Sequence, residues 1–312
     1  MTNISVSAHF SNQFHKFKEV ACLNILTPFE YFAPATLDEA LELLATKENA
    51  KVLAGGTDLM VQLKEKMIHP ANVIDITHVP ELNEFKVEEG KGAVLGACTT
   101  DAFCEFSEEL KAKYPAFAYA AGEIGGPQVR EMGTIGGNLA NSGPSAETPA
   151  SLICYRAQLV LVSKNGERTI PVEDFITGNR KNCLEAGEII KTIILPEPAA
   201  NTFVKYGYVG MRSSMEIDIA NMCIRLDVED GEIKDAMCVM GSVAIKPLIS
   251  EAVPKALIGT KVGDEEAIKA AAEAAQSEVH PITDVRASAA YRVDVIGALC
   301  RRLLRELAAE IN

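Results

Sequence analysis

Apolar residues fall at helical and strand spacings in turn along the first quarter of the chain. Thr36 and Glu39 have the spacing of a capping box, and the leucines that follow lie on one helical face. A short apolar run at 52–54, a second helical pattern over 59–67 and another apolar run at 73–76 come next. This order of strand, turn, helix and strand predicts a βαβ unit whose two strands pair in parallel.

The pattern in the middle of the chain predicts two hairpins and a group of helices. Strands are expected at 85–87 and 93–97 around a Glu-Gly-Lys-Gly turn. A second pair is expected at 159–163 and 169–172 around Asn165-Gly166, a dipeptide typical of tight hairpins. Helices are expected at 99–112, 115–123 and 149–155.

The last third of the chain begins after an apolar strand at 189–195. Pro196 and Pro198 end that strand, and we expect a domain boundary there. Beyond the prolines, the pattern predicts three antiparallel strands and then helices, at 202–208, 218–228 and 233–243 for the strands and 248–257, 264–277 and 287–310 for the helices. The apolar residues of the last helix share one face, which should pack on the sheet: Val293, Ile296, Leu299, Cys300, Leu303, Leu304 and Leu307.

Composition narrows the class of protein. A chain of 312 residues with 48% hydrophobic content should fold into two or three subdomains. Its net charge of −13 argues against nucleic-acid binding. The eight cysteines are scattered without metal-ligand spacing, and no apolar run is long enough to span a membrane. We therefore expect a cytoplasmic protein without a metal site of its own, and we assign no function to the N-terminal extension at 1–27, where His9 and His15 lack partners.

Two glycine-rich segments carry the candidate chemistry. Gly122–Glu147 holds seven of the chain's 22 glycines. We expect Gly136 and Gly137 to adopt left-handed dihedrals and to expose consecutive N–H groups that bind anionic oxygens. Gly55 and Gly56 lie where a predicted strand ends and a helix begins, which is a second position for a phosphate. Neither segment has P-loop or GxGxxG spacing, so tight turns without a ligand stay open as an alternative.

These two motifs, VLAGGTDLM at 52–60 and GPQVREMGTIGGNLANSGPSAETP at 126–149, resemble the FAD-binding subunit of molybdenum hydroxylases. This is the family of xanthine dehydrogenase and of the carbon monoxide dehydrogenase medium subunit. The resemblance implies an α+β fold with a two-part FAD-binding domain at 28–198, made of a small βαβ subdomain at about 28–84 and a mixed or antiparallel subdomain at about 85–198. A C-terminal domain at 199–312 would follow, with a three-stranded antiparallel sheet and a helical bundle.

The resemblance also implies which residues hold the cofactor. The residues at the pyrophosphate would be, on one side, Val52, Leu53, Ala54, Gly55, Gly56, Thr57, Asp58, Leu59 and Met60, and on the other Thr134, Gly136, Gly137 and Asn138. Asn141 and Glu147 would lie along the ribose and toward the isoalloxazine, with Glu147 standing where relatives often have aspartate. Ile124 would lie against the flavin and Ile190 near the adenine. Tyr208 stands where relatives often carry a lysine, which puts the redox potential and the reactivity toward NAD in question.

The function that the resemblance implies is electron transfer. FAD in this chain would take electrons from [2Fe-2S] clusters on a small partner subunit and pass them to NAD or another acceptor. Molybdopterin and the hydroxylated substrate would belong to a large partner subunit. No catalytic side chain is expected, because flavin carries the electrons itself. Two alternatives stay open: a stand-alone FAD-dependent oxidoreductase, with Arg130 or Arg212 over the flavin, and a flavin-less assembly subunit.

Overall fold

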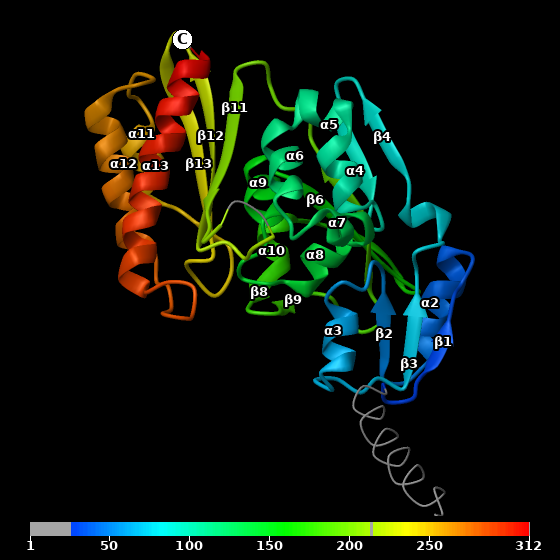
Figure 1. The fold of residues 1–312 in the computed structure, drawn as a ribbon. Helices are drawn as coiled ribbons and strands as arrows, with labels where there is room; N and C mark the ends of the chain where they lie inside the picture. The colour runs from blue at the N-terminus through cyan, green and yellow to red at the C-terminus, as the bar shows by residue number, and fades with distance from the viewer. Residues whose placement is uncertain (1–25, 213–214, 312) are drawn as a thin grey trace, which may run out of the picture.

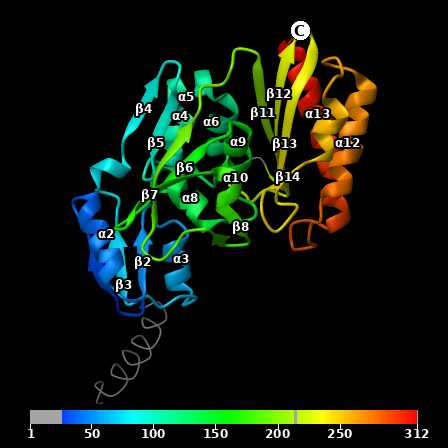
Figure 2. The same cartoon turned by 180° about the vertical axis from the view of Figure 1, so that it is seen from behind.

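The chain is arranged around three larger β-sheets, beside a short two-stranded one, in this computed structural model, which describes residues 26–212 and 215–311 (Figure 1). The first 25 residues of the expected extension, including His9 and His15, lie outside the described part. We call the sheets the small sheet, the large sheet and the C-terminal sheet, in chain order. In Figures 1 and 2 the large sheet and its helices lie between the other two. Within the described residues, no helix is both long and apolar enough to cross a membrane.

The small sheet contains the predicted βαβ unit. Its elements are β1 (Glu30–Phe32), α2 (Leu37–Thr46), β2 (Ala50–Leu53), α3 (Leu59–Lys64) and β3 (Asn72–Asp75). The strand order is β1-β3-β2 and both pairings are parallel, which confirms the prediction for β2 and β3. The capping box forms at α2, because the Glu39 N–H donates to Thr36 Oγ1 over 3.2 Å. β1 was not predicted, because a strand of only three residues shows no alternation of apolar and polar positions.

The large sheet is antiparallel, with strand order β4-β5-β10-β6-β7. Its strands are β4 (Phe85–Glu88), β5 (Gly92–Gly96), β6 (Gln158–Ser163), β7 (Gly166–Pro171) and β10 (Ile189–Leu195). Both predicted hairpins are confirmed, as β4–β5 and β6–β7. β10 lies in the centre of the sheet, where Ile193 and Leu195 are buried in the core, whereas Thr192 and Ile194 on the opposite face are only partly buried.

Short helices cover the large sheet on the side of the C-terminal sheet (Figure 1). The helices and the short elements beside them are η2 (Pro80–Leu82), α4 (Asp101–Phe106), α5 (Glu108–Lys113), α6 (Pro115–Gly122), α7 (Pro127–Met132), α8 (Ile135–Asn141), α9 (Thr148–Cys154), α10 (Val172–Phe175), β8 (Ile176–Gly178) and β9 (Lys181–Asn182). The helix expected at 99–112 is divided at Ser107, whose Oγ accepts from the Leu110 N–H and so caps α5. The glycine-rich segment, expected as a loop, is largely helical as α7 and α8.

The C-terminal sheet contains the three predicted antiparallel strands and one short addition. Its elements are β11 (Thr202–Val209), β12 (Ala220–Glu229), β13 (Glu232–Gly241), β14 (Leu248–Ile249), α11 (Ala252–Leu257), α12 (Glu265–Glu278) and α13 (Ala289–Ile311). Asp230 and Gly231 both have positive φ in the β12–β13 turn, as the dipeptide predicted. The helix expected from 248 begins only at 252, because Leu248 and Ile249 pair with β13 instead. Pairing with a buried strand overrides the local helical pattern.

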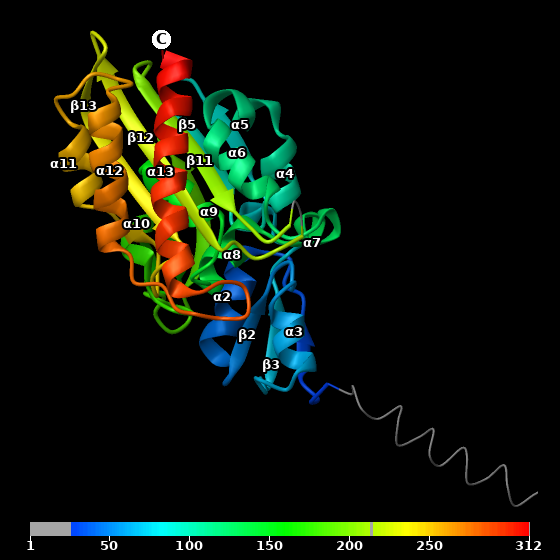
Figure 3. The same ribbon diagram turned by 60° about the vertical axis from the view of Figure 1, so that its left-hand side comes forward.

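The C-terminal sheet is buried on both faces. Cys223 on β12 faces the core shared with α6 and α9, whereas its neighbours Met222 and Ile224 face α11, α12 and α13. Figure 3 shows α13 lying across β11 and β12. The predicted apolar face of α13 is therefore the face that packs on the sheet. The segments before and after Pro196–Pro198 share one hydrophobic cluster, so the chain on the two sides of the prolines packs as a continuous body.

Candidate functional site

The two glycine motifs meet in space. Gly55 lies in the loop between β2 and α3, near its β2 end, and packs directly against the backbone that joins α7 to α8. A Cβ on Gly55 would lie 1.7 Å from the Met132 carbonyl oxygen and 2.9 Å from Gly133 Cα. No side chain fits there, so glycine is required for close backbone approach. The motifs, far apart in sequence, therefore form one locus between the small sheet and the helices of the large sheet (Figure 1).

The first motif presents unused hydrogen-bond donors. Among the described residues, no acceptor is found for the N–H groups of Gly55, Gly56, Thr57 and Asp58, whereas Met60 donates normally to the Gly56 carbonyl over 2.9 Å. Gly56 has φ +71°, a left-handed dihedral that turns the loop. Thr57 is exposed and its three neighbours are partly buried, so water can bind these N–H groups in the free chain and a ligand can replace that water. Consecutive free N–H groups in a turn suit anionic oxygens, such as those of a diphosphate.

The glycine pair of the second motif offers no unused N–H groups. The prediction that Gly136 and Gly137 adopt left-handed dihedrals and expose their N–H groups is wrong. Neither Gly136 nor Gly137 has positive φ, because both lie in the first turn of α8. The Gly136 N–H donates to the Ala97 carbonyl over 2.9 Å, and the Gly137 N–H donates to Thr134 Oγ1 over 3.1 Å. A Cβ on Gly136 would lie 2.5 Å from the Ala97 oxygen. This glycine therefore allows α8 to pack against the end of β5 and leaves no N–H group free for a ligand.

A residue that the sequence did not single out connects the two motifs. Arg180, in the turn between β8 and β9, donates from Nη1 to Asp58 Oδ2 over 3.0 Å and from Nη2 to Asp58 Oδ1 over 3.3 Å. The same Nη1 donates to Asn141 Oδ1 over 3.0 Å. Asp58 belongs to the first motif and Asn141 to the second. One arginine in a short turn carries no distinctive sequence signal, because its position depends on how the β8–β9 hairpin packs against α8.

Further along the second motif, polar side chains lead to a buried acidic group. Asn138 accepts from Thr148 Oγ1 over 2.7 Å and so ties α8 to α9. Glu147, just before α9, is 8% exposed. Burial raises the pKa of Glu147 well above its ordinary value, and the nearby Asp218 carboxylate raises that pKa further. Glu147 is therefore protonated more readily than an exposed glutamate and can donate a hydrogen bond.

Asp218 extends this acidic region into the C-terminal sheet. Its Oδ2 accepts from the Tyr206 hydroxyl over 3.2 Å and from Asn221 Nδ2 over 2.9 Å. Burial raises the pKa of Asp218 to about 7, against the lowering effect of these two hydrogen bonds. Asn221 Nδ2 also donates to the Ala146 carbonyl, next to Glu147, over 3.5 Å. The surroundings of Glu147 are therefore held by hydrogen bonds from residues before Pro196 and from residues after Pro198.

The other residues assigned by resemblance lie at different depths. Ile124 is buried, and its carbonyl accepts from Arg130 Nη1 over 3.1 Å. Tyr208 is half-buried on β11, and burial followed by the Glu123 carboxylate raises the pKa of its hydroxyl. Ile190 lies on β10 opposite Leu161 and is 4% exposed, so its side chain belongs to the core of the large sheet. The structure packs Gly55 of the first motif against Met132 and Gly133, and it links Asp58 to Asn141 through Arg180. The buried side chain of Ile190 shares a hydrophobic cluster with Ile135 and Leu139 of α8.

The two arginines considered for a stand-alone enzyme differ in their surroundings. Arg130 is buried and forms an ion pair with Glu105, with Nε to Oε2 at 2.7 Å. Its Nη1 donates to the Ile124 and Gly125 carbonyls, so its guanidinium is occupied in holding the loop before α7. Arg212 is exposed, and its backbone N–H donates to the Glu216 carboxylate over 2.7 Å. Arg130 is therefore a structural residue, as its burial and its ion pair with Glu105 require.

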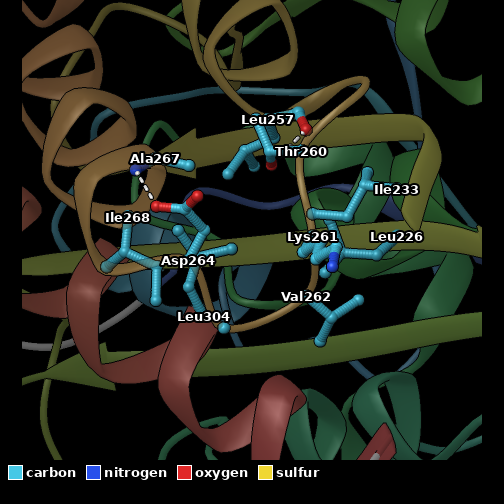
Figure 4. Close-up of a pocket in the computed structure, with 11 residues that line it drawn as sticks. Leu226, Ile233, Leu257, Thr260, Lys261, Val262, Asp264, Ala267, Ile268 and Leu304 are labelled. Atoms are coloured by element: carbon cyan, nitrogen blue, oxygen red, sulfur yellow. Dashed lines mark hydrogen bonds between the residues drawn. The ribbon is translucent and has the colours of Figure 1, made fainter. Parts of the chain in front are cut away.

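Two cavities lie away from the two motifs. The one in Figure 4, between β12, β13, the loop before α12 and α13, has a volume of about 10 Å³, which is room for about one water molecule. A larger one of about 280 Å³ lies where α5 and α6 meet β11 and the end of α13. Neither is lined by a residue of the two motifs. Within residues 26–212 and 215–311, no group of three or more His, Cys, Asp or Glu side chains is placed to hold a metal ion.

Known proteins share both the sequence and the fold. The family described as the FAD binding domain in molybdopterin dehydrogenase matches residues 27–198, and the CO dehydrogenase flavoprotein C-terminal domain matches residues 207–307. The carbon monoxide dehydrogenase medium chain of Hydrogenophaga pseudoflava is 34% identical over 277 residues, which cover 88% of this chain and 96% of that one. The glyceraldehyde dehydrogenase medium chain of Sulfolobus acidocaldarius is 31% identical over 280 residues, covering 90% of this chain and 98% of the other.

A solved structure agrees with both matches. It is a carbon monoxide dehydrogenase from Hydrogenophaga pseudoflava that lacks the Mo-pyranopterin moiety of its cofactor. Its matching chain superposes with a TM-score of 0.87 at 34% identity, covering 91% of this chain and 99% of that chain. The α+β fold expected from the sequence is thereby confirmed, with β1 and β14 as additions. The chain belongs to the family of FAD-binding subunits of molybdenum hydroxylases, and it is the flavoprotein part of an oxidoreductase complex.

Proposed function

We propose that this chain binds FAD at the meeting point of its two glycine motifs and transfers electrons from [2Fe-2S] clusters on a small partner subunit to NAD or another acceptor. The observation that carries the proposal is the first motif, where four consecutive N–H groups have no acceptor among the described residues and Gly55 packs against the second motif. Such donors fit a diphosphate, the central group of a flavin dinucleotide. A net charge of −13 leaves the rest of the surface unsuited to holding an anion, so the binding must be local.

The two motifs would contribute to binding in different ways. The N–H groups of Gly55–Asp58 would hold the diphosphate, and the second motif would form the opposing wall through Thr134–Asn138 and Asn141. Bound FAD supplies the redox chemistry, accepting electrons and delivering them to the acceptor. The chain itself orients the cofactor and excludes water from it.

Protons and charge at the flavin would be set by buried acids. Glu147 would hold a proton and donate a hydrogen bond, because burial and Asp218 raise its pKa. Tyr208, where relatives often have a lysine, is a neutral hydroxyl beside Glu123. The chain would therefore offer no cation at that position, and an anionic reduced flavin would be less stabilised than beside a lysine.

The partners follow from the same reasoning. Two of the relatives are named medium chains, which suits a complex with a molybdopterin-binding large subunit and a [2Fe-2S] small subunit. Those relatives are named for carbon monoxide and for glyceraldehyde, so the hydroxylated substrate would be chosen by the large subunit and not by this chain. We also propose that the chain divides at Pro198 into an FAD-binding domain at 28–198 and a C-terminal domain at 199–312.

A stand-alone flavoenzyme is the weaker alternative, because Arg130 is already engaged by Glu105. The discriminating experiment is to purify the chain with its native partners and to record metal content and visible spectrum. Molybdenum, iron and bound FAD in one complex, with flavin reduced through the clusters and reoxidised by added NAD+, is the expected result. A yellow isolated chain that oxidises a small molecule without partners would support the alternative. A complex whose purified chain binds no FAD would support the assembly subunit.

A further inference from the structure

Arg180 is the side chain that joins the two motifs. Within residues 26–212 and 215–311, no other side chain hydrogen-bonds to residues of both motifs. We call Arg180, Asp58 and Asn141 the clasp. A role for the clasp rests on the proposed FAD site and goes beyond it, because Arg180 lies outside both glycine motifs.

The backbone of Arg180 is fixed to the second motif. Its N–H donates to the Ser142 carbonyl over 2.9 Å, and its φ of +53° is left-handed, which a non-glycine residue adopts only when its surroundings impose it. Asn182, on the same hairpin, donates from Nδ2 to the Ala140 carbonyl over 2.8 Å. The β8–β9 hairpin therefore moves with the end of α8, and only the Arg180 side chain reaches across to the first motif.

The other end of the clasp is fixed to the first motif. Asp58 precedes α3, and its carboxylate also accepts from Gln62 Nε2 within that helix. Arg180 binds both oxygens of this carboxylate, which is the bidentate geometry that gives an arginine its specificity. The clasp thus links the start of α3 to the end of α8, and Asp58 is itself the last residue of the segment whose N–H groups have no acceptor among the described residues.

The charges of Asp58 and Arg180 also affect how well the first motif would hold a diphosphate. Asp58 belongs to the loop whose N–H groups would hold a diphosphate, and an unpaired carboxylate there would repel it. Arg180 neutralises that carboxylate. The pair is half exposed, with side-chain exposures of 51% and 37%, so salt screens it and weakens the link between the motifs.

We propose that Arg180 is a positioning residue that holds the first motif closed over the FAD diphosphate and so slows release of the cofactor. It acts through Asp58 and Asn141 and does not itself need to touch FAD. The prediction concerns the rate of FAD release, which a purely structural ion pair elsewhere on the surface would not change.

The test uses the full chain loaded with FAD and follows release by the rise in flavin fluorescence, at low and at high salt. Arg180→Gln should release FAD about five to ten times faster than the parent chain at low salt, with an unchanged melting temperature of the FAD-free chain. Asp58→Asn should accelerate release similarly, and the double variant should be no faster than either single one, because both remove the same contact. High salt should accelerate release from the parent chain and not from Arg180→Gln.

The matched control is Arg305→Gln, which removes a bidentate pair with Glu265 of comparable exposure, 57% for Arg305, on the outer helices. It should release FAD at the parent rate. Parent-like release from Arg180→Gln would overturn the clasp. So would fast release from Arg180→Gln with parent-like release from Asp58→Asn, since this would mean that the guanidinium binds the diphosphate directly. Failure of the proposed FAD site itself would appear separately, as a parent chain that binds no FAD.

Discussion

Replacing Gly55 by alanine tests the contact on which the site depends. The new Cβ would lie 1.7 Å from the Met132 carbonyl oxygen, so the loop or the end of α7 must retreat by about 1.7 Å to restore ordinary contact at 3.4 Å. Overpacking of this kind costs about 1–3 kcal/mol. The strain falls on the loop that carries the free N–H groups, and a tenfold change in affinity corresponds to about 1.4 kcal/mol. We therefore expect Gly55→Ala to weaken FAD binding by about tenfold to hundredfold.

The assay is titration of the FAD-free chain with FAD, read by quenching of flavin fluorescence, with a melting curve of each variant. Gly178→Ala is the control, because a Cβ there would lie 3.9 Å or more from its neighbours and the residue is outside both motifs. It should bind FAD with the parent dissociation constant. A Gly55→Ala variant with the parent affinity for FAD would refute the reasoning, because it would mean that the two motifs need not touch for the cofactor to bind.

The remaining predictions concern the walls of the site and its buried charges. Thr134→Ala removes the acceptor of the Gly137 N–H, so it should lower the free energy of unfolding by about 1 kcal/mol and weaken FAD binding. Thr36→Ala removes an equivalent cap on α2, so it should lower the free energy of unfolding by the same amount and leave the FAD affinity unchanged. Urea unfolding measures the stability and FAD titration the affinity. Arg130→Gln leaves Glu105 without its buried ion-pair partner and should lower the free energy of unfolding by about 3 kcal/mol. Lys111→Gln removes an exposed ion pair and should lower it by less than about 1 kcal/mol. Equal losses in urea unfolding would contradict the structural role of Arg130. For Asp218, the folded pKa of about 7 lies above the ordinary aspartate pKa of 3.8, so the unfolded chain loses this proton first and the folded state is destabilised as pH rises between these values. The stability of Asp218→Asn relative to the parent chain should therefore increase between pH 4 and pH 7 and stay constant above that range, and a difference independent of pH would contradict the pKa.

The strands of the fold could be predicted because local pattern and tertiary environment agree there. The parallel pair β2–β3 and the hairpins β4–β5 and β6–β7 all follow from apolar runs bounded by turn residues. The strands that the sequence missed are short, and each depends on a partner strand: β1 pairs only with β3, β14 only with β13, and β8 only with β9. Two or three residues carry no period, so their structure is decided by the neighbour they pair with.

The candidate site was predictable in its parts and not in its arrangement. Glycine density drew attention to both motifs, but it did not distinguish the two uses of glycine. Gly56 turns a loop with positive φ, whereas Gly136 allows a helix to pack so close to the Ala97 carbonyl that a Cβ would lie 2.5 Å from its oxygen. Only the hydrogen-bond partners of each N–H group separate these cases. Arg180 was not predicted as part of the site, because its contacts depend on how the β8–β9 hairpin packs, and that hairpin has no regular pattern of apolar and polar residues.

The asymmetry between the motifs has a consequence for how a cofactor could enter. The second motif is held rigidly, because the N–H groups at the start of α8 are all used: Ile135 donates to the Thr99 carbonyl, as Gly136 and Gly137 donate to their own acceptors. The first motif has free donors, a glycine turn and a side-chain link to the second through Arg180. Local opening requires breaking the fewest hydrogen bonds, so the β2–α3 loop is the part that should move when FAD binds or leaves. Hydrogen exchange would detect this as fast exchange at 55–58 and slow exchange at 135–138 in the FAD-free chain, and protection of 55–58 when FAD is bound.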